Sequence, residues 1–306
     1  MPRVHLQHLS IDEIRIILDE LERAMTAHDS WIKDWHRILI CRLPIDDEYL
    51  SQDTHQTCGF GEWYYTQTHP GLRNHPDFMA IEATHRKMHA QARKLARKTR
   101  QGKRLSNDDY LAFVEQEYSL SQELIALKES FHEFLAMFDH LTGVYNRQAM
   151  FPILAQEHAR VLRTGQPCSI AIVDLDHFKR INDTYGHQIG DLVLQCTAQY
   201  FADNLRPYDW FCRYGGEEFL VCLPNTSVDT AQTILDRFRS GLAESPITCD
   251  DAVLIKITVS VGVAAMSADV SLKETIARAD CAMYTAKRAG RNRLCTWEDT
   301  GDFKAL

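Results

Sequence analysis

Acidic side chains stand at the ends of two predicted strands in the second half of the chain. The stretch RYGGEEFLV puts Glu217 and Glu218 directly after two glycines, and the strand SIAIVDLD ends in Asp174 and Asp176. Glycines between apolar runs predict a hairpin whose tight turn requires positive φ angles. Alone, Glu217 and Glu218 would fit a turn with solvated acids. Because sheets bind ligands at the carboxyl ends of strands, the second acidic strand end favours a cation site.

Carboxylates without a neighbouring His or Cys in the sequence suit hard divalent cations. Mg²⁺ and Mn²⁺ prefer oxygen ligands, and they keep water molecules that phosphate oxygens can replace. Gly215 and Gly216 would let a polyphosphate approach the backbone without a side-chain clash. This corner of the sheet is therefore predicted to hold Mg²⁺ or Mn²⁺ together with a phosphorylated ligand.

The motifs around these acids resemble those of the GGDEF family of diguanylate cyclases, over residues 139–306. RYGGEEF is similar to the family signature in its GGEEF form, and DHLTGVYNR resembles the opening motif. DLDHFKRINDTYGHQIGD resembles the nucleotide-binding segment, and ADCAMYTAKRAGRN the closing motif. The resemblance implies that two GTP molecules are joined into cyclic di-GMP with release of two pyrophosphates. Each domain would bind one GTP, so the enzyme would be a homodimer with a two-fold axis.

The resemblance also implies a role for each matching position. Asp174, Glu217 and the backbone carbonyl of Leu175 would hold two divalent metals on the GTP phosphates, and Glu218 would be a further ligand or a base. Metals there would activate the attacking hydroxyl and stabilise the leaving pyrophosphate. The remaining GTP-binding positions are Phe178, Lys179, Asn182, Asp191, Gly215, Gly216, Lys287 and Arg291.

Ordinary structural roles compete with several of these assignments. Asn182 and Asp191 would recognise guanine, yet Gly186 can also end one helix and Asp191 can cap the next. Lys287 and Arg291 are four residues apart on the last predicted helix, so they would face the same way. A basic helix end also complements the helix dipole, and only the resemblance favours phosphate contacts there.

A second ligand site is predicted at RPYD, residues 206–209, five residues before the GGEEF motif. In the family, an RxxD pair in this register forms an inhibitory site for the product. Arg206 would bind a guanine edge or a phosphate, and Asp209 would accept from guanine donors. The alternative is a local surface ion pair that contributes little.

Histidine and cysteine side chains of the first half have spacings that fit a metal. His85 and His89 in EATHRKMHAQARK are four residues apart, so a helix would direct both rings to one side. By spacing alone, an exposed face of a basic helix is the favoured interpretation. Cys58 in TCGFGEW and His28 in MTAHDSW add two further ligands, and three His with one Cys complete a tetrahedral zinc shell.

The same pieces resemble the chemoreceptor zinc-binding domain, across most of residues 10–130. In that family a His, a Cys before a Gly and Trp motif, and an HxxxH pair bind zinc within a helical bundle. We assign His28, Cys58, His85 and His89, and the nearby alternatives are His36, Cys41, His55, His69 and His75. Four protein ligands leave no position for a reacting water, so this zinc is expected to be structural or regulatory. Ligand protonation or oxidation of Cys58 would weaken it.

The elements that must position these residues divide the chain in two. Residues 1–138 follow a helical pattern and end in a long helix over about 107–138, which carries a heptad seam. That seam fits a dimer contact and a core-facing helix equally well. Its members are Leu120, Leu124, Leu127, Phe131, Phe134 and Phe138.

Residues 139–306 alternate strands and helices and predict an α/β domain with a mainly antiparallel sheet. Strands are predicted at residues 168–176, 210–214, 218–224 and 255–266, and helices at residues 190–205, 228–242 and 272–290. The fold class is therefore an α+β multidomain protein: an all-α bundle joined by a long helix to a GGDEF domain. Zinc occupancy is expected to shift helix packing, and the long helix to pass that change to the cyclase domains.

Charge and composition exclude several other classes. The net charge of −8 opposes binding to nucleic acid or to an anionic membrane. The basic run at residues 93–104 lacks interleaved aromatics and fits a solvated helix end. The first 25 residues turn amphipathic and acidic too early for a secretory signal, and no apolar run could span a bilayer, so we expect a cytoplasmic protein. The nine cysteines, without a CxxC motif, are expected to be mostly buried small side chains.

Two rival functions differ from a zinc-regulated cyclase. A catalytically silent domain would bind GTP or cyclic di-GMP as an effector, and its expected mark is the loss of an acidic ligand or a glycine. Neither is lost here. Alternatively, the N-terminal bundle would dock onto a chemoreceptor or scaffold, with zinc serving only to hold the bundle together.

Overall fold

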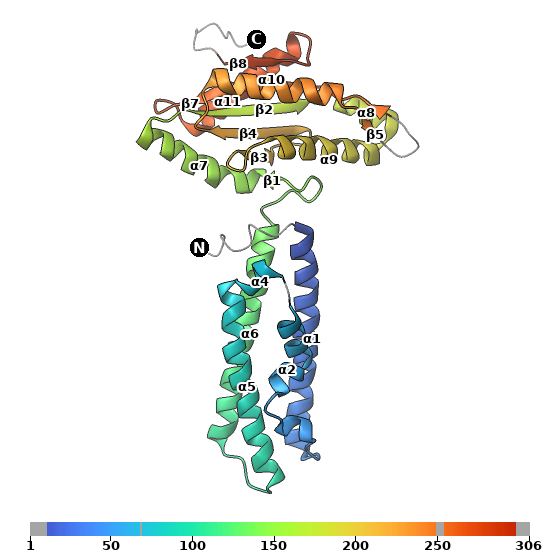
Figure 1. The fold of residues 1–306 in the computed structure, drawn as a ribbon, viewed down its shortest axis with the longest axis vertical. Helices are drawn as coiled ribbons and strands as arrows, with labels where there is room; N and C mark the ends of the chain where they lie inside the picture. Colours follow the sequence, from blue (N-terminus) through green and yellow to red (C-terminus); the bar gives the residue numbers. More distant parts are fainter. Residues whose placement is uncertain (1–10, 68, 249–253, 298–306) are drawn as a thin grey trace. The chain divides into compact units, whose positions relative to one another are not determined.

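The computed structural model describes residues 11–67, 69–248 and 254–297. Its contacts divide the chain into a unit of Met1–Ala136 and a unit of Met137–Leu306, close to the predicted boundary after residue 138 (Figure 1). The first ten residues, which the prediction about a secretory signal includes, lie outside the described residues. None of the described helices has the length and apolar character needed to cross a membrane.

The first unit is built of three long helices and several short ones. The long helices are α1 (Ile11–Cys41), α5 (Pro76–Arg100) and α6 (Asn107–Leu135). The aromatic connection between α1 and α5 is partly helical. Its short helices are η1 (Asp47–Leu50), α2 (Thr54–Thr57), α3 (Gly59–Thr66) and α4 (Pro70–Arg73). A reciprocal capping box, in which Ser106 and Asp109 bind each other's backbone N–H groups, starts α6.

The predicted seam on α6 faces the core of its own bundle. Leu120, Leu124, Leu127 and Phe131 are at most 3% exposed, and α6 packs along α5. Phe138 does not belong to this face, because α6 ends at Leu135. Of the two interpretations of the seam, the core-facing helix is therefore correct.

The second unit contains a six-stranded sheet in the order β1-β3-β4-β2-β7-β8. Its pairs are antiparallel except β1 with β3 and β7 with β8, so the predicted mainly antiparallel sheet is confirmed. The strands are β1 (Tyr145–Asn146), β2 (Cys168–Leu175), β3 (Trp210–Arg213), β4 (Glu218–Pro224), β7 (Val259–Met266) and β8 (Leu294–Thr296). β5 (Ile247–Thr248) and β6 (Leu254–Ile255) form a separate hairpin. The segment 255–266, predicted as one strand, is divided: residue 255 ends β6, and β7 begins at residue 259.

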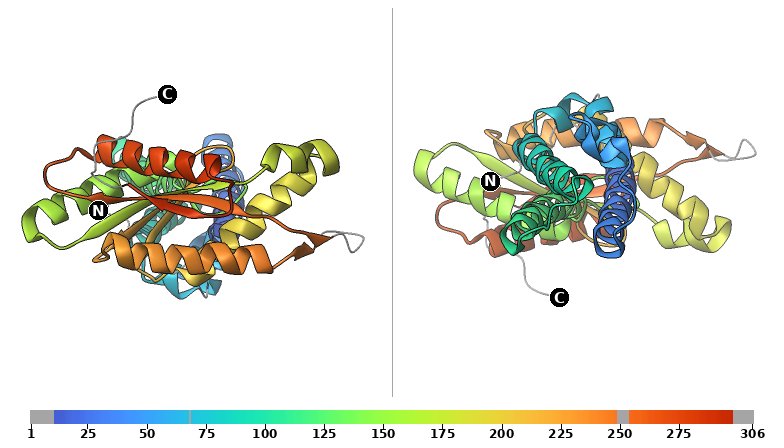
Figure 2. Two further views of the ribbon diagram at one scale, coloured as in Figure 1. Left: turned by 90° about the horizontal axis from the view of Figure 1, so that it is seen from above. Right: turned by 90° about the horizontal axis from the view of Figure 1, so that it is seen from below.

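Helices cover both faces of this sheet. They are α7 (Arg147–Thr164), α8 (Phe178–Tyr185), α9 (His187–Asn204), α10 (Val228–Glu244) and α11 (Leu272–Arg288). Alternate residues of β2 join two different cores: Val173 packs with α8, α9 and α10, and Ile172 packs with α7 and α11. Figure 2 shows α10 and α11 on opposite sides of the strands. A Cβ at Gly262 would strike the backbone of Met283, so glycine lets α11 lie close on β7.

Candidate active site and metal centre

The acidic corner forms where β2 and the β3–β4 hairpin end side by side. Asp174 lies opposite Glu218 in the antiparallel register, and the Leu175 N–H donates to the Glu217 carbonyl at 3.2 Å. At the hairpin turn, the N–H groups of Tyr214 and Gly215 both donate to the Glu218 carbonyl. The pairing of these two strands therefore brings the predicted carboxylates to one corner.

The glycines of the hairpin do not have the predicted backbone conformation. Among the described glycines, those with positive φ do not include Gly215 or Gly216. The loop from Tyr214 to Glu217 is longer than a two-residue turn, so it does not require left-handed residues. A Cβ on Gly215 would lie 2.6 Å from Glu218 Oε2, whereas a Cβ on Gly216 would have no neighbour within 4 Å. Absence of a side chain is therefore what matters at Gly215.

Asp174 has the electrostatics of a cation ligand. It is 2% exposed, and its Oδ2 lies 2.6 Å from Lys287 Nζ. Its Oδ1 is buried without a hydrogen-bond partner among the described residues. Burial, opposed by Lys287 and helped by Glu217 and Glu218, raises the pKa of Asp174 to about 6. A buried carboxylate oxygen without a donor next to two more acids fits a bound divalent cation.

Asp176, two residues further on, has a structural role: its hydrogen bonds stabilise the fold. Its carboxylate accepts from the Thr258 and Ser260 hydroxyls at 2.7 and 2.6 Å and from the Asn292 N–H at 2.9 Å. These contacts tie the end of β2 to β7 and to the segment after α11. The two carboxylates of one strand end therefore have different roles, and of the pair Asp174 is the one with an unused oxygen.

Arg213 positions the glycine turn, a role that the sequence analysis missed. Its Nη2 donates to the Gly216 carbonyl at 2.7 Å, and its Nη1 lies 3.1 Å from Asp139 Oδ1. Asp139 also accepts from the N–H and hydroxyl of Thr142. The opening motif DHLTGVYNR is thereby linked to the GGEEF turn. Each motif was visible in the sequence, but their contact spans 74 residues and left no local pattern.

The predicted guanine-binding residues flank the junction of two helices. Asn182 is half-buried on α8, and Asp191 is exposed on α9. A Cβ at Gly190 would strike the Asn182 side chain, so glycine allows the two helices to approach there. Gly186 ends α8 and also precedes the first residue of α9. The alternative role of Asp191 as a helix cap is therefore wrong.

One of the predicted phosphate-binding positions, Arg291, differs from its expected setting. α11 ends at Arg288, so Arg291 is not on the helix and does not share a face with Lys287. Gly290 at φ 115° and Arg291 at φ 61° turn the chain away, which the helical spacing did not reveal. At the start of α8, Phe178 is buried and Lys179 is exposed. The phosphate-binding roles of Phe178, Lys179, Lys287 and Arg291 stay predictions.

The RPYD segment forms a local turn. Asp209 Oδ2 accepts from the Arg206 backbone N–H at 3.0 Å, and the guanidinium carbon of Arg206 lies 5.9 Å from the Tyr208 ring centroid. The described residues show no ion pair between the two side chains. Asp209 Oδ1 is buried and has no hydrogen-bond partner among the residues that the structure describes, and burial raises the pKa of this carboxyl. The surface ion pair considered as the alternative is therefore not what the segment forms.

The first unit brings His28, Cys58, His85 and His89 together in its interior. Their potential ligand atoms all lie within 4.8 Å of one another, and all four residues are at most 4% exposed. Cys58 Sγ is 3.4 Å from His85 Nε2, which is 3.1 Å from His89 Nε2. α1 supplies one ligand, the residue before α3 another, and α5 the HxxxH pair.

The donor set fits a zinc ion. Neither ring nitrogen of His28 has a hydrogen-bond partner among the described residues, although both are buried. Burial lowers the pKa of His28 to about 4 and lowers those of His85 and His89, which keeps the rings neutral as metal ligands require. Burial raises the pKa of the Cys58 thiol to about 11, so metal binding would have to displace its proton.

Two glycines of the CGFG sequence allow the cluster to form. A Cβ at Gly59 would lie 2.7 Å from Ala27 Cβ on α1, and one at Gly61 would strike the His55 carbonyl. Cys58 Sγ accepts from the Gly61 N–H at 3.3 Å. Since Ala27 precedes His28 and Gly59 follows Cys58, this close approach of α1 and α3 brings the two ligands together.

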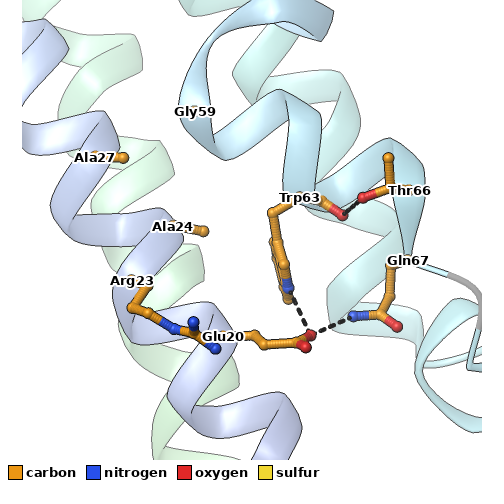
Figure 3. A pocket seen from close by; sticks show the side chains of 8 residues that line it. All are labelled: Glu20, Arg23, Ala24, Ala27, Gly59, Trp63, Thr66 and Gln67. Carbon is orange, nitrogen blue, oxygen red and sulfur yellow. Dashed lines mark hydrogen bonds between the residues drawn. The ribbon is translucent and has the colours of Figure 1, made fainter.

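A pocket of about 460 Å³ borders this approach (Figure 3). The Trp63 indole and the Gln67 amide both point to Glu20 and donate to its Oε2 at 3.3 and 3.4 Å. These bonds join α3 and the residue after it to α1, five to nine residues along the chain from the ligands. They support the position of Cys58 without touching it.

The alternative zinc ligands lie in other settings. His36 is near Glu117 and His69 near Glu13, while Cys41 is exposed. His55 and His75 are buried, His55 with Nδ1 close to the Gln52 carbonyl. Among the described residues, the cluster of possible metal ligands contains none of these five.

Comparison with known proteins gives the same two-part organisation. The family model "Diguanylate cyclase, GGDEF domain" matches residues 136–293. The model "Chemoreceptor zinc-binding domain" matches residues 28–96, a segment that contains all four clustered ligands.

Three curated relatives differ in how much of their length the chain matches. Diguanylate cyclase DgcP of Pseudomonas aeruginosa is 41% identical over 60% of this chain, and response regulator PleD of Caulobacter vibrioides 42% over 52%. The chain spans only 27% and 36% of those proteins. Diguanylate cyclase DgcZ of Escherichia coli is 30% identical over 92% of this chain and 94% of its own length.

Solved structures of GGDEF proteins resemble the second unit. The coiled coil and GGDEF domain of DgcB from Caulobacter crescentus, in complex with c-di-GMP, gives a TM-score of 0.56 at 31% identity. The match covers 60% of this chain and 99% of that one. The DgcB GGDEF domain alone gives 0.52 at 34% identity, over 54% and 97%. The chain therefore belongs to the GGDEF family of diguanylate cyclases and combines its GGDEF domain with a chemoreceptor zinc-binding domain.

Proposed function

We propose that this protein is a diguanylate cyclase that joins two GTP molecules into cyclic di-GMP and two pyrophosphates. The observation that carries the proposal is the acidic corner: buried Asp174, with one unused oxygen, beside Glu217 and Glu218 at the end of paired strands. The relatives named as diguanylate cyclases support it, DgcZ over nearly the whole chain.

Asp174 and Glu217 would hold magnesium, with the Leu175 carbonyl as a further ligand. When bound, the metal neutralises phosphate charge and lowers the pKa of a coordinated hydroxyl. Lys287, already 2.6 Å from Asp174, would contribute a positive charge to the phosphates. Glu218 lies opposite Asp174 in the sheet and would accept the proton of the attacking 3′-hydroxyl. The 3′-oxygen of that hydroxyl would then bond to the α-phosphorus of the other GTP, while the bond between this phosphorus and the leaving pyrophosphate breaks.

The rest of the substrate would lie along the start of α8 and the approach of α8 to α9. The backbone of Phe178 and Lys179 would bind the phosphates. Arg291, four residues after Lys287 in the sequence, would also contact them. The Asp191 carboxylate would accept hydrogen bonds from the guanine N1 and N2 donors, and the Asn182 amide would bind the remaining edge of the base. One domain binds one GTP, so the reaction requires a homodimer with facing domains.

Zinc at His28, Cys58, His85 and His89 would regulate this activity. A shell of four protein ligands leaves no open position, which favours a structural or regulatory ion over a catalytic one. The ligands come from α1, from the residue before α3 and from α5, so zinc occupancy bears on how these helices pack. We expect zinc removal to change the rate of cyclic di-GMP formation without removing Mg²⁺ from the cyclase unit.

Product feedback at Arg206 and Asp209 completes the proposal. The Arg206 side chain is exposed, and Asp209 keeps a buried oxygen that has no hydrogen-bond partner among the described residues. A guanine nucleotide bound by Arg206 would supply a donor to that oxygen. Arg206→Ala should relieve inhibition by added cyclic di-GMP and leave the initial rate unchanged. Equal inhibition of the wild type and the variant would remove this site from the scheme.

The deciding experiment is GTP turnover with Mg²⁺ by the full chain, with the product identified by mass and Asp174→Asn as control. Repeating it after zinc chelation, with zinc and protein-bound metal quantified, tests the regulation. Cyclic di-GMP from the wild type alone supports the proposal. Tight GTP or cyclic di-GMP binding without turnover, in a folded dimer, would instead support the silent effector function.

A further inference from the structure

A stripe of exposed apolar side chains runs along the outside of α6. Leu111, Tyr118 and Ile125 are 45%, 65% and 38% exposed, and they recur every seven residues. The buried residues Phe113 and Leu120 each follow a stripe residue by two positions, or about 200° around the helix. The stripe thus lies opposite the face that packs in the bundle core.

The sides of α6 next to the stripe are already occupied. Lys128 forms an ion pair of 2.6 Å with Glu22 on α1, and the Thr84 hydroxyl on α5 donates to Glu123 at 2.8 Å. α1 and α5 therefore flank the helix and leave its outer surface open. Single exposed apolar residues need no explanation, but three in one heptad register over fifteen positions form a coiled-coil type of surface.

We propose that this stripe is the dimer contact, and that its occupant is α6 of a second copy of the chain, packed parallel to it. The inference rests on the proposed function, because joining two GTP molecules requires two cyclase units. A seven-residue repeat on one helix is self-complementary about a two-fold axis, where each position of type a meets its own copy. α6 is also the last helix before the cyclase unit, which begins two residues after Leu135.

The residues between the stripe positions suit close packing of two helices. Ser121 and Gln122 are exposed, uncharged and lie between Tyr118 and Ile125. Val114 is half-buried beside Leu111. The seam predicted from Leu120 to Phe134 is not available for this contact, since the bundle core buries it. The proposed dimer surface therefore lies on the opposite side of α6 from the seam that the sequence pattern indicated.

Charge substitutions at Ile125 test the contact in the zinc-loaded full chain. Ile125→Glu should raise the dimer dissociation constant at least tenfold in sedimentation equilibrium, because two like charges meet at the axis. Ala126→Glu adds the same charge one residue on, about 100° around the helix, and should leave the constant unchanged. Zinc content and helical circular dichroism report whether each variant is folded.

Mixing two variants gives the sharper result. Ile125→Glu and Ile125→Lys chains should each dissociate alone and should form dimers when mixed, because residue 125 meets residue 125. A general loss of folding would not be rescued in this way. Tyr118→Glu with Tyr118→Lys should behave the same.

Each outcome separates this inference from the proposed function. Sedimentation needs no turnover, so variants that behave as expected support the contact even if the wild type makes no cyclic di-GMP. A dimer that persists in Ile125→Glu, a mixture without rescue, or a wild type that is monomeric up to 100 µM would overturn the contact, whatever the activity.

Discussion

At the scale of single residues, Asp174 and Asp176 show how one strand end separates function from fold. Within the described part of the chain, the Asp176 carboxylate has three donors, whereas Asp174 has Lys287 on one oxygen and no partner on the other. A buried carboxylate short of donors is destabilising when ionised. The two residues are therefore expected to respond in opposite directions to the same substitution.

Asp174→Asn should stabilise the metal-free cyclase unit at pH 7.5 while abolishing cyclic di-GMP formation. The pKa of Asp174 in the folded state, about 6, exceeds the ordinary value of 3.8. At pH values between these two, the folded state therefore binds more protons than the unfolded state. Stability from this group is present below pH 4 and is lost as pH rises through 6. The gain should be about 1 to 3 kcal/mol at pH 7.5 and close to zero at pH 4, measured by hydrogen exchange of β2 amides.

Asp176→Asn is the matched control. The amide replaces one acceptor oxygen by a donor facing the Thr258 and Ser260 hydroxyls and the Asn292 N–H, which should lower stability by about 1 to 3 kcal/mol at pH 7.5. If both variants changed stability in the same direction, the assignment of a structural role to one carboxylate and a ligand role to the other would be wrong.

Cys58→Ser should weaken zinc binding at least 100-fold, by the loss of a thiolate that a neutral hydroxyl does not replace. The readout is zinc transfer to a competing chelator of known affinity. Cys41→Ser, which changes an exposed cysteine on α1, should bind zinc like the wild type. Equal zinc affinity in all three proteins would mean that Cys58 is not a ligand.

At the scale of elements, the approach of α3 to α1 controls the zinc cluster through Gly59. Gly59→Ala puts a Cβ 2.7 Å from Ala27 Cβ, so α3 must move away and carry Cys58 with it. Zinc affinity should fall at least tenfold although all four ligands remain. Adding Ala27→Gly removes the opposing methyl and should recover most of the affinity, less the roughly 1 kcal/mol that glycine costs a helix. Failure of the double variant to recover would show that the clash is not the cause.

Local patterns in the sequence predicted those elements whose residues interact with near neighbours. β2, β3 and β4 follow from continuous apolar runs, and α9, α10 and α11 from helical spacing. α7 was missed, and Pro152 within it weakens its helical pattern. The end of α11 was placed too late because Arg291 continues the spacing past Gly290, where the backbone turns left-handed.

Contacts between distant segments were beyond such patterns. The bond of Arg213 to Asp139 and the three donors on Asp176 join segments 74 to 116 residues apart. The positive φ angles expected at Gly215 and Gly216 assumed a two-residue turn, and the loop is longer. The zinc positions were named from short motifs and a resemblance, while their proximity depends on a close packing of α1, α3 and α5 that no local pattern contains.

At the scale of the whole molecule, activity should belong to the pair of chains and not to either one. Two bonds must form to close the proposed cyclic product, and each chain would supply the metal ligands for one GTP. A dimer of one wild-type chain and one Asp174→Asn chain can therefore complete at most one bond. Excess Asp174→Asn chains, equilibrated with the wild type, should suppress cyclic di-GMP formation nearly in proportion to the wild-type chains that they pair with.

The same mixture made with chains that carry both Asp174→Asn and Ile125→Glu should leave wild-type activity intact. Such chains keep the defective corner but lack the contact by which they would pair through α6. The measurement is the rate of cyclic di-GMP formation at fixed wild-type concentration against increasing amounts of each variant, with Ala126→Glu in place of Ile125→Glu as control. Suppression by the double variant would mean that chains associate through another surface. No suppression by Asp174→Asn itself, with chain exchange verified, would mean that one intact corner completes the reaction.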